Sequence, residues 1–441
     1  MARNPLVRDF LLWVGALLLL IALPFVFTQN THLSVLSRMG IAVVFALSYN
    51  MLFGQGGMLS FGHAAFAGLG AYLTIHALGL MNKGALAFPV TLLPLVGGLA
   101  GMLFTVPFAY VATKRSGTPF AMITLGIGEL VSAAVLMLPG FFGGEAGITG
   151  NRVTGNTWLG IDYGSQLQMY YLVAGWTFAS TLAMYAFTRT PLGLICNAVR
   201  DNAERTEFLA YNPKRVRFLV MVVAGFFAGI SGALAALTYE IVNAESVGLN
   251  ASGNVLLMAF IGGVGQFFGP ILGAILLTLL QSALSLFTPA WLLYIGLLFL
   301  AMMLFAPGGL SSIIVAHGPA WRAGLVPRLL PSYLAALAAG AVLLAGTVGL
   351  VEMLYFLSDS ARPAALSLAG LTVDPGRVAP WIVSGAVLAA GCAFVRFAAA
   401  WVAAQWQQLR QELNARAPAR PARRSAAAGI ESAATVPGAP T

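Results

Sequence analysis

The chain has 441 residues, of which 59 % are hydrophobic and only 8 % are charged. A soluble protein of this length needs a charged surface, which this composition does not supply, so soluble classes are excluded. Long apolar runs recur along the chain, and each is long enough to cross a bilayer as a helix. Because these runs are continuously apolar and not alternating, they indicate helices and not a β-barrel. The sequence predicts an all-α, polytopic membrane bundle of about ten crossings plus one re-entrant segment.

The first apolar run, Phe10–Phe27, follows Arg3 and Arg8 and is not followed by a small-residue cleavage site. We interpret it as a retained first span whose N-terminus lies inside. The later predicted spans, in chain order, are Leu36–Phe53, Met58–Leu80, Phe88–Ala112, Pro119–Leu138, Gln168–Phe187, Val216–Leu237, Asn254–Leu286, Trp291–Phe305, Leu330–Leu357 and Pro380–Val402.

Basic residues predict the orientation of these spans, because Lys and Arg are enriched in inside loops. Alternation places Lys114 and Arg115 inside, but a single crossing at Asn254–Leu286 would then put Arg322 and Arg328 outside. The glycine-rich sequence AFIGGVGQFFGPILGA in that span suggests a hairpin that enters and leaves on the outer side, which restores the rule. The residues leave a second interpretation open, in which these glycines serve only close helix packing.

Catalytic constellations are not found in the sequence. It contains four histidines and two distant cysteines, without HExxH, paired cysteine ligands, G-x-S-x-G or a G-x-x-x-x-G-K-[ST] phosphate loop. We therefore expect no enzyme activity, no metal and no cofactor, and any ATP would have to be hydrolysed by a separate subunit. The excess of Lys and Arg reports membrane topology, and we expect no nucleic-acid partner.

The longest inside loop, Thr188–Phe218, predicts a short amphipathic helix that begins at Pro191 and is ended by Asn212-Pro213. Its apolar face would hold Leu192, Ile195, Val199 and Ala203, spaced as helix neighbours are. Its charged face would hold two i,i+4 pairs of opposite charge, Arg200–Glu204 and Asp201–Arg205. Such a helix is either a solvated connector at the lipid surface or a docking element for another subunit.

Several segments resemble the family of branched-chain amino-acid ABC permeases, and within it the LivM-type subunit. LSYNMLFGQGGMLSFGHAAFAGLGAY (Leu47–Tyr72) resembles the family signature G-Q-x-S-x-G-H-A-A-F. The later segments with such a resemblance are TPFAMITLGIGEL (Thr118–Leu130), GGEAGITG (Gly143–Gly150), RDNAERTEFLAYN, AGFFAGISGALAAL, IGGVGQFFGPILGA and LFAPGGL. The resemblance covers about Leu36 to Leu310.

The resemblance implies a complex with a LivH-type second permease subunit, two ATP-binding subunits and a periplasmic substrate-binding protein, in a bacterial inner membrane. It places an ATPase coupling loop at Asn197–Asn212, with Asn197, Arg200, Asp201, Asn202, Glu204 and Arg205 as candidate coupling residues. The sequence departs from the family pattern at Met58, at Ala210, where glycine is usual, and at Gly308, where a basic residue is usual.

Two glycine-interrupted membrane segments point to a translocation route, because broken helices in the two halves of a transporter expose backbone groups that solvate a polar solute. The candidate pathway residues are Gln55, Ser60, His63, Glu129, Gly262, Gly263, Gly265 and Gln266. Two of them have a structural alternative. In that alternative, His63 is hydrogen-bonded to a neighbouring helix, and Glu129 is a structural partner and not a substrate contact.

The predicted organisation is an N-terminal span and outer loop (1–35), a permease core (36–316), two additional spans (317–404) and a disordered basic cytoplasmic tail (405–441). Both termini are expected in the cytoplasm. A different class of function is a stand-alone secondary transporter or channel for a small polar solute, and a third is a membrane-embedded enzyme. The ordered motifs and the amphipathic inside loop favour the ABC permease, since a proton-driven carrier would show more intramembrane carboxylates.

Overall fold

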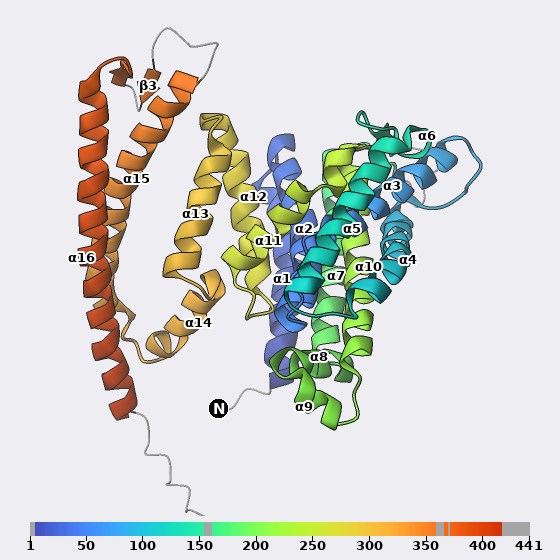
Figure 1. Cartoon of the computed structure of the whole chain (residues 1–441), viewed down its shortest axis with the longest axis horizontal. Coiled ribbons are helices and arrows are strands. Elements are labelled where there is room, and N and C mark those ends of the chain that lie inside the picture. Colours follow the sequence, from blue (N-terminus) through green and yellow to red (C-terminus); the bar gives the residue numbers. More distant parts are fainter. Residues whose placement is uncertain (1–4, 154–160, 359–365, 369–370, 417–441) are drawn as a thin grey trace, which may run out of the picture. The chain divides into compact units, whose positions relative to one another are not determined.

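The computed structural model describes residues 5–153, 161–358, 366–368 and 371–416. The chain separates into two compact units, Met1–Ile314 (unit 1) and Val315–Thr441 (unit 2). Among the described residues, nine helices are long and apolar enough to cross a membrane, or ten if one bent pair of helices is counted as a single span. The prediction of a polytopic helical membrane protein is confirmed (Figure 1).

Unit 1 is built mainly from helices. In chain order they are α1 (Pro5–Val26), α2 (Asn30–Asn50), the π-helical turn η1 (Met51–Gln55), α3 (His63–Asn82), the 3-10 turn η2 (Val90–Leu92), α4 (Leu93–Ala112), α5 (Thr118–Met137), α6 (Pro139–Phe142), α7 (Gln166–Arg189), α8 (Pro191–Asp201), α9 (Ala203–Phe208), α10 (Pro213–Tyr239), the 3-10 turn η3 (Ala244–Val247), α11 (Leu249–Gly262), α12 (Gly269–Phe287), α13 (Trp291–Phe305) and the start of α14 (Gly309–Arg322).

The core of unit 1 lies where α3, α4 and α10 pack with their backbones in close approach. A methyl group at Gly101 of α4 would lie 2.8 Å from the Cα of Gly229 in α10, and one at Gly70 of α3 would lie 2.7 Å from the same atom. Small residues let helix backbones approach in this way, and the gain is van der Waals packing. These three helices and α2 therefore form the part of unit 1 against which the other elements are positioned.

One end of unit 1 is closed by a two-stranded antiparallel sheet, β1 (Ile148–Thr149) with β2 (Ile241–Val242). Arg152, three residues after Thr149 of β1, is buried here. Its backbone N–H donates to Glu240 Oε1 at 2.8 Å, and its guanidinium donates to the backbone oxygens of Tyr163, Leu237 and Thr238. This cation therefore caps the last carbonyls of α10, where the helix dipole favours positive charge.

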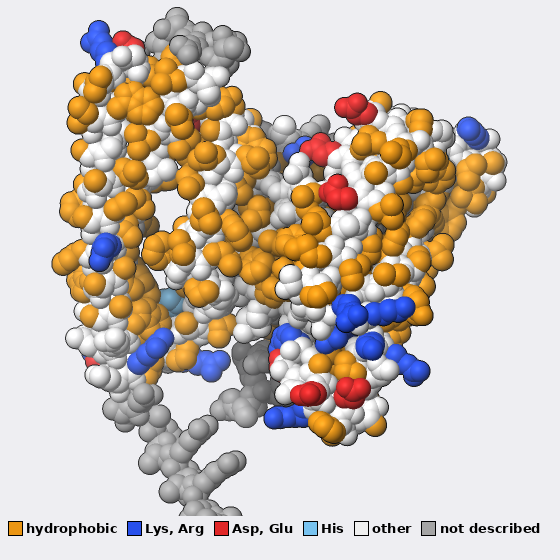
Figure 2. All heavy atoms as spheres, viewed as in Figure 1, with side chains coloured by type: hydrophobic (Ala, Val, Ile, Leu, Met, Phe, Trp, Pro, Cys, Tyr) orange, Lys and Arg blue, Asp and Glu red, His pale blue; other side chains and the backbone are white. Residues whose placement is uncertain are grey.

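The start of α1 lies at the opposite end of unit 1, beside the end of α7, because Arg189 pairs with Asp9 at 3.5 Å. Helices α8 and α9 follow α7 at this end (Figure 1). Figure 2 shows Lys and Arg side chains gathered over this end, below a broad hydrophobic surface. The exposed cations here include Lys114, Arg115, Lys214 and Arg215. We call it the basic end.

The segment Asn254–Leu286 is a pair of antiparallel helices, α11 and α12, as the predicted hairpin requires. Gln281 of α12 donates to Asn254 of α11 at 3.4 Å. A methyl group at Gly273 would lie 2.7 Å from the Gly262 backbone nitrogen. The same glycines therefore both turn the chain and let the two helices pack closely, and the re-entrant topology stays a prediction.

Unit 2 contains the end of α14, the 3-10 turn η4 (Val326–Leu329), α15 (Leu330–Ser358), the strands β3 (Leu366–Leu368) and β4 (Leu371–Val373), and α16 (Val378–Arg416). Helices α15 and α16 pack as a hairpin that also uses close contacts, since a methyl group at Gly346 would lie 2.7 Å from Leu388 Cα. Arg328 forms an ion pair with Glu412 at 2.8 Å.

The predicted disordered tail begins too early. Helix α16 continues to Arg416 because Trp406 donates to Tyr333 Oη at 2.8 Å and Leu409 is buried against Ala320, Leu325 and Leu329. Residues 417–441 of the predicted tail lie outside the described residues.

Candidate functional site

The first glycine-rich segment interrupts the helical chain between α2 and α3. A π-helical turn covers Met51–Gln55, residues Gly56–Gly62 are not helical, and α3 begins at His63 and not at the predicted Met58. π-Turns are rare and are frequent at functional sites. We call Met51–Gly62 the first break.

Buried polar atoms without a described partner gather at the first break. They are Tyr49 Oη, Asn50 Oδ1, Gln55 Oε1, Ser60 Oγ and His63 Nδ1. Each of these five residues is at least nine-tenths buried. Because an unpaired buried polar atom is costly, such a cluster calls for water or for a polar solute.

His63 is enclosed on all sides in this conformation. Its Nε2 lies 2.9 Å from Ser48 Oγ, and the rings of Phe45, Tyr49 and Phe66 surround the imidazole with centroid distances between 5.5 and 6.1 Å. One ring nitrogen is therefore held by α2, which fixes the orientation of the ring, while the other nitrogen has no partner among the described residues.

The second break, Gly263–Phe268, joins α11 to α12. Gly263 has φ +103°, a conformation that only glycine adopts without strain. Gly262 and Gly263 are buried, whereas Gly265 and Gln266 are exposed. Ser311 donates to the Gly263 backbone oxygen at 3.4 Å.

The two breaks meet. A methyl group at Gly54 of the first break would lie 2.8 Å from the Val264 backbone oxygen of the second, and the rings of Phe53 and Phe260 are 5.1 Å apart. The structure therefore brings the two predicted glycine segments together. It does not bring Glu129 into this cluster, since that carboxylate lies on an exposed face of α5.

The coupling loop (Asn197–Asn212) is not one continuous helix. α8 ends at Asp201, Asn202 is extended at φ −158° and ψ 101°, and the Asn202 side chain accepts from the Arg205 backbone N–H to cap α9. The predicted pairs Arg200–Glu204 and Asp201–Arg205 are therefore wrong, because they need a continuous helix through Asn202. An asparagine favours a cap over a helix interior, which is the physical reason for the break.

The predicted apolar face is confirmed, with Leu192, Ile195 and Val199 on α8 and Ala203 at the start of α9. Val199 is buried, and Leu192, Ile195 and Ala203 pack against the core of unit 1. The neighbouring Cys196 is also buried. On the charged side, Asp201, Glu204 and Arg205 are exposed, and Asn197 is half-buried.

Arg200 is turned toward the first break. Its guanidinium donates to the Gly54 backbone oxygen and pairs with Asp201 at 3.0 Å. Its stem covers Gly57, where an added methyl group would lie 2.8 Å from Arg200 Cγ. The coupling loop is thus linked directly to the first break, which the sequence pattern did not indicate.

Sequence reasoning missed an exposed apolar tip on α9. Phe208 is 89 % exposed and Leu209 is 67 % exposed. Ala210 follows with φ +66°, so the left-handed turn that usually takes glycine forms here with alanine. The sequence did contain an indication of this tip. The apolar pair Phe208-Leu209 directly follows the charged stretch, and it does not fit the helical spacing of the predicted apolar face.

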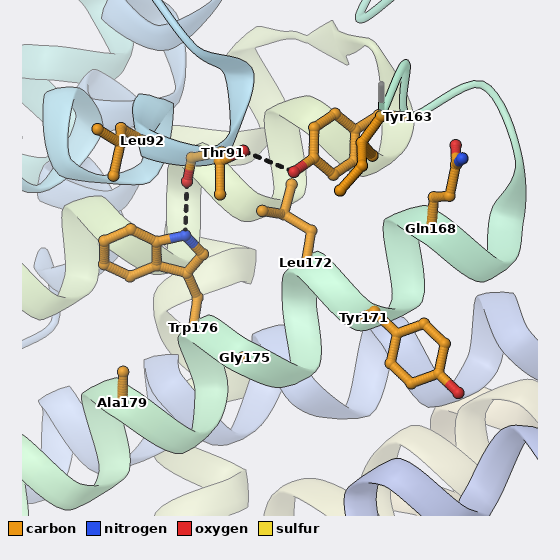
Figure 3. Close-up of a pocket in the computed structure, with 10 residues that line it drawn as sticks. Thr91, Leu92, Tyr163, Gln168, Tyr171, Leu172, Gly175, Trp176 and Ala179 are labelled. Carbon is orange, nitrogen blue, oxygen red and sulfur yellow. Dashed lines mark hydrogen bonds between the residues drawn. The ribbon is translucent and has the colours of Figure 1, made fainter. Parts of the chain in front are cut away.

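A separate open pocket of about 500 Å³ lies between η2 and α7. Figure 3 shows its lining. Trp176 Nε1 donates to the Thr91 backbone oxygen at 2.8 Å, and Thr91 Oγ1 lies 2.6 Å from Tyr163 Oη. None of the predicted site residues lines this pocket. Among the residues that the structure describes, no three His, Cys, Asp or Glu side chains are grouped as metal ligands.

Comparisons with known proteins agree with this architecture. A family model described as the branched-chain amino acid transport system permease component matches residues 31–307. The LivM permease protein of Escherichia coli K12 is 28 % identical over 331 residues, which cover 69 % of this chain and 75 % of that protein. The LivH permease protein of the same strain is 23 % identical over 259 residues, 54 % of this chain and 80 % of LivH. No solved structure matches.

Proposed function

Because the chain belongs to the family of permease components of branched-chain amino acid transport systems, we propose that it is the membrane subunit of an ATP-driven importer of such amino acids. Relatives of this chain include both LivM and LivH, which are named as permease proteins of high-affinity branched-chain amino acid transport systems. This supports a translocation route formed with a second, LivH-type permease subunit. Two ATP-binding subunits and a periplasmic substrate-binding protein complete the proposed complex.

The observation that carries this proposal is the projecting segment α8–α9 at the basic end. Its inner face is anchored on the core, and its outer side presents Phe208 and Leu209 among charged side chains. Exposed apolar residues rimmed by polar ones are typical of protein interfaces. In a chain without a phosphate-binding loop, an ATP-binding subunit is the occupant that this surface needs.

The basic end also supports a proposed orientation of the chain in the membrane. We propose that the basic end faces the cytoplasm of a bacterial cell, with both termini inside, because Lys and Arg are enriched in inside loops. Reporter fusions after Ser311 and after Ser425 should give a cytoplasmic signal. A periplasmic signal at both positions would contradict this topology.

The proposed substrate route passes the two breaks. Unpartnered buried atoms of Gln55, Ser60 and His63 support a place where water or an amino-acid zwitterion replaces missing partners. Single cysteines at Ser60 and Gln266 should react with a small hydrophilic thiol reagent, at a rate that nucleotide or loaded binding protein changes. If both cysteines are inert in every state of an active transporter, the breaks serve packing alone.

The docking proposal is tested with the Phe208→Asp, Leu209→Asp double variant in the co-expressed complex. We expect the ATP-binding subunits to be lost on purification while the two permease subunits stay associated, because charge replaces the apolar contact. The matched control is Glu207→Gln, which changes an adjacent exposed residue without altering the apolar tip. ATP-driven leucine uptake into proteoliposomes by the parent complex tests the function itself. Retention of the ATP-binding subunits by the double variant would overturn the docking proposal.

A further inference from the structure

Helix α5 is attached to the rest of unit 1 through one face only. On that face Thr124 Oγ1 accepts from the Phe61 backbone N–H at 3.2 Å, and a methyl group at Gly128 would lie 3.0 Å from Gly62 Cα. Both contacts are with the end of the first break. One side of α5 is therefore fixed against the proposed substrate route.

The opposite side of α5 is open. Met122, Gly126, Glu129, Leu130 and Ala133 are all exposed, and they recur at the three- and four-residue spacing of a single helix face. An added methyl group at Gly126 would meet no atom within 4 Å. We call these five residues the open face of α5.

Glu129 decides what this open face can contact. It lies eleven residues after Thr118, about 16 Å along the helix axis, and so near the middle of the span. Among the described residues, no side chain pairs with its carboxylate or hydrogen-bonds to it. Carboxylates at this depth are costly in lipid, and they normally face a bundle interior or a water-filled cavity.

Two other poorly buried helices of unit 1, α12 and α13, differ from α5 in this respect. α12 and α13 carry no acidic or basic residue at all, so their exposed sides are compatible with lipid. The open face of α5 is not, because the hydrocarbon would surround an unpaired carboxylate. A protein surface that leaves room for water is required there instead.

We propose that the open face of α5 is the surface against which the second permease subunit packs, with the Glu129 carboxylate facing a water-filled gap between the two subunits. This rests on the proposed function for the identity of the occupant. A second copy of this chain is disfavoured, because a two-fold interface would bring the same patch of both copies together, with two Glu129 carboxylates in a poorly solvated space. Gly126, one turn away, lets a helix of a different subunit approach closely.

The occupant is identified by photo-crosslinking in the intact, co-expressed complex. A benzophenone amino acid at Met122, which is 58 % exposed, should form an adduct with the second permease subunit. The matched control is the same amino acid at Leu103 of α4, which is 67 % exposed and should give lipid adducts only. An adduct of Met122 with lipid alone, or with a second copy of this chain, would overturn the proposal.

Water access at Glu129 is tested separately, by a charged thiol reagent on Glu129→Cys in a Cys392→Ser background. We expect modification at least about tenfold faster than for Leu103→Cys, because the thiolate forms only where water reaches the sulfur. Ala133→Cys, one turn away on the same face, gives the same information if Glu129→Cys does not assemble. Rates equal to that of Leu103→Cys would overturn the proposal. Neither readout needs ATP-driven uptake, so failure of the proposed function would be seen separately, in the parent complex.

Discussion

Replacing Arg200 is expected to separate ATP hydrolysis from uptake. The guanidinium reaches the Gly54 backbone oxygen and Asp201 at the same time, so Arg200→Ala removes the described side-chain link between α8 and the first break. A hydrogen bond from a charged group contributes about 1.5–3 kcal/mol, and the lower value applies because the Arg200 side chain is 37 % exposed. Since about 1.4 kcal/mol corresponds to a tenfold change in an equilibrium, uptake per ATP hydrolysed should fall by about tenfold.

The assay is leucine uptake and phosphate release measured on the same proteoliposomes. Arg200→Lys should be nearly as impaired as Arg200→Ala, because one ammonium group cannot reproduce the two-sided geometry of the guanidinium. Lys214→Ala is the matched control, since Lys214 is an exposed cation of the basic end that lies outside the coupling loop. If Arg200→Ala transports as much leucine per ATP as the parent, the link does not carry coupling, and the reasoning from this contact is refuted.

Three further predictions concern the breaks and the coupling loop. Gly263→Ala should lower the free energy of unfolding of the detergent-purified protein by at least about 1 kcal/mol, seen as a lower melting temperature, because φ is +103° and the added methyl group meets backbone atoms. Gly265→Ala is the control, and it should change the melting temperature little because the space around Gly265 is open. Ala210→Gly should raise stability by up to about 1 kcal/mol in the same melting assay, since glycine relieves the left-handed strain, and a loss would contradict this. Burial raises the pKa of the Cys196 thiol to about 12, so its thiolate is scarce at pH 8 and it should stay unlabelled by a maleimide that labels Asp201→Cys, as mass spectrometry would show.

The membrane spans were predictable because apolar runs and glycine-broken runs are local properties of the sequence. The first break was visible as GQGG, and the hairpin at α11–α12 was visible because a single crossing conflicted with the distribution of basic residues. The start of α3 was misplaced from His63 to Met58, since Met58 and Leu59 are apolar and composition does not distinguish them from the helix that follows.

The contacts of the coupling loop were not predictable in the same way. Whether Arg200 faces outward or toward Gly54 depends on two segments that are 146 residues apart. The break at Asn202 depends on a local competition between helix and cap that the charge pattern concealed. Likewise, the sequence places Glu129 in the middle of a span, but only the packing of Thr124 and Gly128 on the first break determines which way the carboxylate faces.

The glycine contact between α4 and α10 also has a consequence for biosynthesis. α4 ends at Ala112 and α10 begins at Pro213, so the chain between them must be made before Gly97 and Gly101 can meet Gly229. At roughly 5–20 residues per second, synthesis from Gly101 to Gly229 leaves the glycine surface of α4 unpaired for about 6–26 s. Membrane insertases or lipids must occupy that surface meanwhile, and a chain that stalls before α10 would present it to quality-control proteases.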